Sequence, residues 1–189
     1  MTPPPAPEAV IARVTAPIGE LIAGLRTVIR RGLSPELTAH LVGELLAPTL
    51  GSADLLTAPQ REGDPDTYRQ HVLHAEPDGS FSLVALVWLP GQRTPIHDHV
   101  SWCVTGVYEG QEHERRYRLL ADGPTSRLIP IGDTVNPAGS VAAFAPPGDI
   151  HRVSNCGTDK AISIHIYGAD ISRLGTSIRR TYHAPEGER

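Results

Sequence analysis

The sequence predicts a mainly β fold, a barrel of short strands with a helical layer at its N-terminal end. Before about residue 50, apolar residues recur at spacings of three and four, which is typical of amphipathic helices. From Tyr68 onward the apolar period changes to two, and Gly, Pro and Asp turns divide the chain into short runs. Helices followed by many short strands favour a helical layer packed on an antiparallel barrel.

The helical layer is expected over residues 9–60. Its first helix is indicated by the spacing of Ile18, Leu21, Ile22, Leu25, Val28 and Ile29. Ser34 followed by Pro35 is typical of an N-cap with proline at the first helical position, so a second helix should run from there through Leu45 or Leu46. Residues 1–8 are rich in proline and are expected to be a disordered tail.

The barrel is expected over residues 68–167, followed by a C-terminal segment over 168–189. Its predicted strands are 68–74, 81–89, 102–109, 111–120, 141–145, 152–155 and 161–167. The C-terminal segment should contain a short helix between Asp170 and Tyr182. Residues 9–189 then form one domain, a size at which an adequate core can be buried.

Composition excludes several classes of function. The chain has 17 Lys and Arg against 21 Asp and Glu, without a basic stripe, so no nucleic-acid partner is expected. No apolar run is long enough to span a bilayer, and the N-terminus lacks the features of a secretory signal, so we expect a cytoplasmic protein without membrane contact. Two cysteines cannot build a disulfide framework, and the oligomeric state is left open.

Three histidines indicate a metal site. Side chains repeat with period two along a strand, so His97 and His99 should lie on one face, with Asp98 pointing away. His151 stands at another predicted strand start and can complete a three-nitrogen site. Three protein ligands leave positions open for substrate, which is typical of a catalytic metal. Open coordination favours Fe(II) over zinc, although the ligand set also suits Zn, Ni or Mn.

A second group of polar residues follows on the last predicted strand. Alternation places Ser163, His165 and Tyr167 on one face, with Ile164 and Ile166 on the other. Such a row can relay hydrogen bonds and fix the tyrosine hydroxyl near a metal. The alternative is an exposed barrel face with incidental polar residues.

Both histidine segments resemble the two sequence motifs of the cupins. The first motif is matched at Gly91, His97, His99 and Gly110, with Cys103 where cupins usually carry Glu. The second is matched, with one extra residue after its first glycine, at Gly139, Pro146, Gly148, His151 and Asn155. The resemblance implies a cupin double-stranded β-helix barrel, here with an N-terminal helical layer.

The H-D-H motif, the downstream H-R-V-x-N and the S-x-H-x-Y row resemble the cysteine dioxygenase family of thiol dioxygenases over residues 68–167. This resemblance implies a mononuclear non-haem Fe(II) held by His97, His99 and His151. It implies an outer relay of Ser163, His165 and Tyr167. The expected reaction adds both atoms of dioxygen to a small thiol and gives a sulfinic acid.

One position separates two classes of this family. Where cysteine dioxygenases proper have Arg two residues after a Tyr, Tyr68 is followed by Gln70. This is similar to the bacterial Gln-class enzymes, which favour 3-mercaptopropionate and hold its carboxylate with an Arg of the C-terminal segment. By this resemblance Arg180 is the expected carboxylate partner, with Arg173 as the alternative.

Cys103 departs from the Gln class, whose members more commonly have Gly there. In mammalian cysteine dioxygenases a nearby Cys forms a thioether with the active-site Tyr, so the resemblance implies a possible Cys103–Tyr167 crosslink. The alternative is a small buried apolar residue. Alternative functions are oxidation of L-cysteine, another metal-dependent cupin enzyme, and a non-catalytic cupin binding protein.

Overall fold

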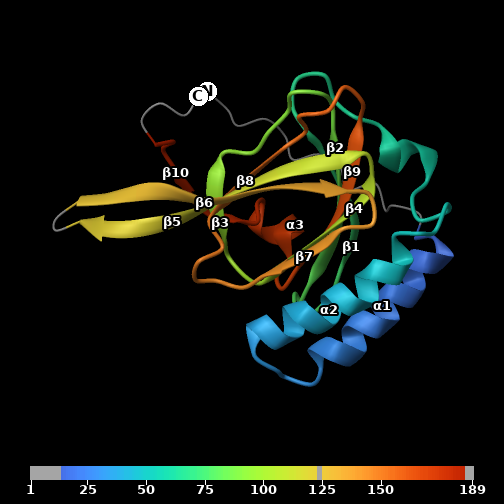
Figure 1. Ribbon diagram of the computed structural model, residues 1–189. Helices are drawn as coiled ribbons and strands as arrows, with labels where there is room; N and C mark the ends of the chain where they lie inside the picture. The colour runs from blue at the N-terminus through green and yellow to red at the C-terminus, as the bar shows by residue number, and fades with distance from the viewer. Residues whose placement is uncertain (1–13, 123–124, 186–189) are drawn as a thin grey trace, which may run out of the picture.

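The computed structural model describes residues 14–122 and 125–185. Two five-stranded antiparallel sheets face each other (Figure 1). The first sheet has the order β1 (Arg69–Ala75), β2 (Ser82–Trp88), β9 (Ala161–Tyr167), β4 (Cys103–Glu109) and β7 (Val141–Phe144). The second has the order β10 (Ile178–Tyr182), β3 (Ile96–His99), β8 (His151–Ser154), β5 (Gln111–Asp122) and β6 (Thr125–Pro137). The predicted mainly β architecture is confirmed.

The predicted helical layer is present as two helices, α1 (Ala16–Ile29) and α2 (Pro35–Thr49), followed by the short 3-10 helix η1 (Ala58–Arg61). The predicted cap is confirmed, because the backbone N–H of Leu37 donates to the Ser34 hydroxyl at 3.3 Å. The second helix continues past its predicted end and includes Pro48 in its last turn. The predicted disordered tail, residues 1–8, lies outside the described part of the chain.

The two helices cover the outer face of the first sheet (Figure 1). Leu25, Val42 and Leu46 pack there with strand residues in one buried apolar cluster. The contact is close at Gly106 of β4, where an added Cβ would lie 2.8 Å from Leu46 and 2.9 Å from Leu50. Glycine therefore lets α2 approach the sheet.

Strands β2 and β9 are buried on both faces. Burial of β9 determines where its polar row, Ser163, His165 and Tyr167, lies. Ile162, Ile164 and Ile166 of β9 pack under the helices. Because successive side chains alternate, Ser163, His165 and Tyr167 project to the opposite face, into the barrel. The alternative of an exposed polar face is therefore excluded.

Strands β6 and β10 were not predicted, and β3 was expected only as the strand that carries His97 and His99, without bounds. Strand β6 contains Pro130, Gly132 and Pro137, residues that argue against a strand in the interior of a sheet. It lies at the sheet edge, and its register with β5 shifts beside Pro130. Strand β10 is a short edge strand with two adjacent arginines, so its apolar pattern is weak.

The remaining predicted strands are confirmed, with ends that differ by up to two residues. The short C-terminal helix is also present, as α3 (Ile171–Leu174), and it leads into β10. Within the described residues, no helix combines the length and apolar character required to cross a bilayer.

Candidate metal centre and its pocket

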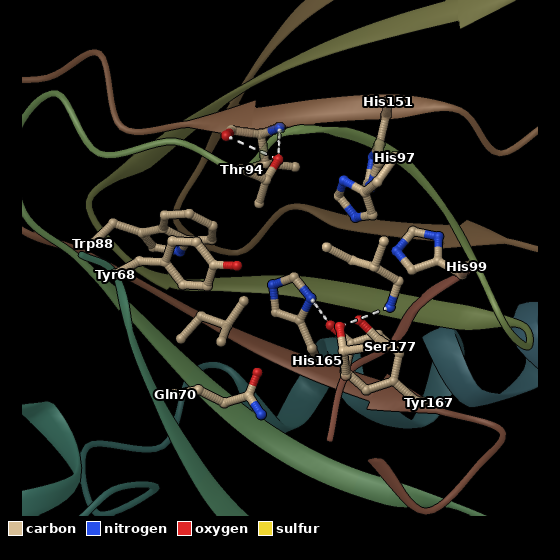
Figure 2. A pocket seen from close by; sticks show the side chains of 14 residues that line it. Tyr68, Gln70, Trp88, Thr94, His97, His99, His151, His165, Tyr167 and Ser177 are labelled. Carbon is tan, nitrogen blue, oxygen red and sulfur yellow. Dashed lines mark hydrogen bonds between the residues drawn. The ribbon is translucent and has the colours of Figure 1, made fainter. Parts of the chain in front are cut away.

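Three buried imidazoles converge inside the barrel (Figure 2). His97 and His99 project from the same face of β3, and His151 opens β8, where it pairs in register with His97. The ring centroids form a nearly equilateral triangle with sides of 4.8, 4.8 and 5.0 Å. One nitrogen from each ring lies within 4.8 Å of the others, as a shared metal ion requires.

Each of the three rings is oriented through its Nδ1 atom. The acceptors are the Pro95 carbonyl for His97 at 2.9 Å, Asp149 Oδ2 for His99 at 3.0 Å, and Glu114 Oε1 for His151 at 2.8 Å. Because Nδ1 donates its proton to an oxygen, Nε2 of each neutral ring keeps a free lone pair. This is the usual way that proteins fix metal-binding histidines, so the three residues fit a divalent metal.

The protonation states also fit a metal. Burial, together with the neighbouring imidazoles, lowers the pKa of His97 to about 3, and burial with His99 lowers the pKa of His151 to about 3. Both rings are therefore neutral and able to coordinate at physiological pH. Burial opposes ionisation of Asp149, but hydrogen bonds from the ring and backbone N–H of His99 hold its pKa below the usual value.

Asp149 and Glu114 were not identified from the sequence. Asp149 follows Gly148, whose φ of 102° lies in the region that favours glycine, and it comes two residues before His151. Glu114 lies on β5, opposite Val153 of β8. The sequence feature that could have pointed to Glu114 is its spacing of two from Glu112, which places both carboxylates on one face of the strand.

The three histidines line one end of a pocket (Figure 2). Its other walls are Tyr68, Gln70, Leu86, Trp88, Thr94, Val153, His165, Tyr167, Thr176, Ser177 and Ile178. The Tyr68 ring packs on the Trp88 indole with a centroid separation of 4.6 Å. Among the described residues no Arg, Lys, Asp or Glu lines this pocket, so its polar surface consists of histidines, hydroxyls and one amide.

The polar row of β9 forms a hydrogen-bonded chain beside the histidines. Ser163 Oγ lies 2.9 Å from His165 Nε2, and the Tyr167 hydroxyl lies 3.1 Å from His165 Nδ1. Burial lowers the pKa of His165 to about 3 and raises the pKa of Tyr167 well above its usual value. The imidazole and the phenol are thus both neutral, and the chain ends at the pocket.

Cys103 lies directly opposite Tyr167 in the pairing of β4 with β9. It is fully buried, and burial with the nearby acidic side chains raises the pKa of its thiol well above the usual value. The thiol is therefore protonated, and Cys103 is not in the group of residues that could hold a metal. Its position beside the tyrosine is compatible with the expected crosslink.

The two arginines expected to bind a carboxylate lie outside the pocket lining. Arg180 pairs with Asp98 across β10 and β3, with its Nε 3.0 Å from Asp98 Oδ2. Arg173 pairs with Asp170 at 3.1 Å and donates to the Pro77 carbonyl. Each guanidinium is thus engaged by a carboxylate elsewhere, and the expected role of Arg180 or Arg173 as carboxylate partner stays a prediction.

Comparison with known proteins finds a matching family model and related sequences. A family model described as cysteine dioxygenase type I matches residues 18–176. Cysteine dioxygenase type 1 of Danio rerio is 31% identical over 110 residues, covering 57% of this chain and 55% of that protein. The Homo sapiens protein of the same name is 27% identical over 108 residues, covering 56% and 54% respectively. The chain therefore spans about half the length of the curated relatives it matches.

Among solved structures, a double-stranded β-helix protein from Klebsiella pneumoniae has a TM-score of 0.46 and 16% identity, covering 64% of this chain and 94% of that one. The barrel has the predicted cupin fold with its N-terminal helices. The match of the family model to most of the sequence shows that this chain belongs to the cysteine dioxygenase type I family.

Proposed function

We propose that the protein is a thiol dioxygenase that converts a small carboxylate-bearing thiol, preferentially 3-mercaptopropionate, into its sulfinic acid. The observation that carries the proposal is one pocket lined both by the three imidazoles and by His165 and Tyr167, whose hydrogen-bonded chain continues to Ser163. The first group provides metal ligands with positions left open, and the second provides an oriented hydroxyl beside them.

In the proposed reaction a thiolate and dioxygen give a sulfinate, R–S⁻ + O₂ → R–SO₂⁻. Both oxygen atoms go to sulfur, which supplies the four electrons, so no separate reductant is required. Iron(II) held by His97, His99 and His151 would supply a lowered thiol pKa and a site for dioxygen. Trp88, Leu86 and Val153 are buried apolar walls of the pocket and exclude water from it.

The preference for 3-mercaptopropionate is supported by the uncharged lining around Gln70. Amide and hydroxyl groups of Gln70, Tyr68 and Ser177 can donate hydrogen bonds to a carboxylate. L-Cysteine brings an additional ammonium group, and the described lining offers no carboxylate to pair with it. That group would have to lose its proton or stay unpaired, and both outcomes cost free energy.

L-Cysteine is the second candidate substrate, because the relatives reported above carry the name cysteine dioxygenase type 1. Both candidates use the same metal and the same chemistry. The two assignments differ in which protein groups would bind the part of the substrate other than its sulfur.

The test is oxygen consumption by the iron-loaded protein with a panel of thiols. We expect kcat/KM to be higher for 3-mercaptopropionate than for L-cysteine, and Gln70→Arg to shift the ratio toward L-cysteine. Gln111→Arg on the exposed start of β5 is the matched control and should leave the ratio unchanged. A wild-type preference for L-cysteine would refute the substrate assignment, and an absence of thiol-dependent oxygen uptake would refute the proposed activity.

A further inference from the structure

Asp98 stands between His97 and His99 on β3, and its buried carboxylate projects to the opposite face of the strand. Its Oδ2 atom accepts three hydrogen bonds from β10. Two come from Arg180, through Nε at 3.0 Å and through Nη2, and one comes from the Tyr182 hydroxyl at 2.9 Å. The Arg180 guanidinium also lies 5.7 Å from the centre of the Tyr182 ring. The function proposed above gives this buried contact no role.

The segment that leads into β10 forms one wall of the pocket. Thr176, Ser177 and Ile178 line it (Figure 2). The backbone N–H of Val100 donates to the Ser177 carbonyl at 3.0 Å, which extends the contact between this segment and the end of β3. Within the described part of the chain, β10 lies at the edge of its sheet and pairs with β3 alone. The position of this pocket wall therefore depends on how firmly β10 is attached to β3.

A β-bulge lets β10 face the pocket at one end and Asp98 at the other. The register with β3 shifts between Ile178 and Arg180, which leaves Arg179 as the extra residue. In a regular strand Ile178 and Arg180 would lie on the same face. With the bulge, Ile178 stands opposite His99 on the pocket face. Arg180 stands opposite Asp98 on the outer face.

We propose that Asp98 is a positioning residue that holds β10 to β3 from the outer face and thereby fixes Ser177 and Ile178 as a wall of the substrate pocket. The Asp98 side chain is only 4% exposed, so separation of β10 would take the hydrogen-bond donors away from a buried carboxylate. The effect on substrate binding rests on the proposed thiol dioxygenase function, whereas the attachment of β10 can be measured without turnover.

Attachment of β10 should control KM. If β10 separates from β3 part of the time, only the remaining fraction of molecules has a complete pocket, and the apparent affinity for substrate falls by that fraction. Once substrate is bound in a complete pocket, the chemistry is the same, so kcat should be kept. The role predicted for Arg180 as carboxylate partner gives the opposite expectation. Release of Arg180 from Asp98 would then lower KM, because the guanidinium would be free to bind the substrate.

The first measurement is amide hydrogen exchange of the zinc-loaded protein, followed by NMR. We expect the Val100 amide to exchange faster in Tyr182→Phe and in Asp98→Asn than in wild type, because its acceptor belongs to the segment that these variants loosen. Hydrogen bonds to a charged group set the scale, so the increase should be roughly 10- to 100-fold. Tyr108→Phe is the matched control, because it removes a hydroxyl that donates to the Ala53 carbonyl, and it should keep the wild-type rate. Wild-type exchange of Val100 in both test variants would overturn the proposal.

The second measurement is the steady-state kinetics of the iron-loaded protein with 3-mercaptopropionate. Tyr182→Phe and Asp98→Asn should raise KM and keep kcat, and Tyr108→Phe should change neither. A wild-type KM in variants whose Val100 amide exchanges faster would overturn the role in substrate binding. A lower KM in Asp98→Asn would also overturn it and would assign Arg180 to the substrate carboxylate. Faster Val100 exchange in the variants of a protein that oxidises no thiol would count against the proposed function alone.

Discussion

Asp149 offers the sharpest test of how the metal site is built, because one buried oxygen orients one ligand. Asp149 Oδ2 accepts from both the backbone N–H and the ring Nδ1–H of His99, each at 3.0 Å. Asp149→Ala leaves both buried donors without a partner, at about 1–3 kcal/mol each, so the metal-free protein should lose on the order of 2–6 kcal/mol of unfolding free energy. Losing a carboxylate that supports a histidine ligand typically weakens metal binding about 10- to 100-fold.

Asp149→Asn separates geometry from charge. Its amide oxygen can accept both hydrogen bonds, so we expect the unfolding free energy to stay within about 1 kcal/mol of wild type, while zinc affinity falls roughly tenfold. Zinc affinity is measured by competition with a chromophoric chelator, and stability by urea unfolding without metal. Asp133→Asn, an exposed carboxylate, is the control and should change neither. Asp149→Ala with wild-type zinc affinity would refute this account of the site.

Three further predictions follow from the same geometry. His151→Ala should remove most bound iron while circular dichroism stays that of the folded protein; full iron content with full activity would show that His151 is not a ligand. Cys103→Ser should slow turnover modestly, and peptide mapping after turnover should find a Cys103–Tyr167 adduct lighter by two hydrogens than the separate peptides; only free peptides would contradict a crosslink. His165 has a pKa of about 3 in the folded protein, compared with about 6.5 in the unfolded chain. As the pH falls below about 6.5, the unfolded chain therefore binds a proton at His165 that the folded protein does not bind. Wild-type stability should therefore fall relative to His165→Phe by about 1.4 kcal/mol per pH unit below that point, and a gap independent of pH would contradict the buried neutral ring.

Much of the site could be predicted because side chains alternate between the two faces of a strand. The period of two places His97 with His99, and Ser163 with His165 and Tyr167, whatever the rest of the fold. These groups could therefore be proposed from sequence spacing alone. The helical layer was equally accessible, because its apolar spacing and the Ser34 cap are local signals.

The residues that support the site could not be predicted in the same way, because their contacts join distant strands. Glu114 reaches His151 from β5, and the Trp88 indole reaches Ser163 from β2. Spacing along the chain does not reveal such pairs. The partner of Arg180 in the C-terminal segment could not be predicted for the same reason. Only the pairing of β10 with β3 shows that Arg180 is engaged by Asp98.

We propose that the central reaction in this pocket is the transfer of both atoms of dioxygen to the sulfur of a bound thiol. Its most direct test is turnover of 3-mercaptopropionate by the iron-loaded protein under oxygen-18 gas, with mass analysis of the product. We expect a sulfinate that carries two labelled oxygens, with one dioxygen consumed per thiol. A sulfinate with one oxygen from water, or a disulfide as the main product, would contradict it.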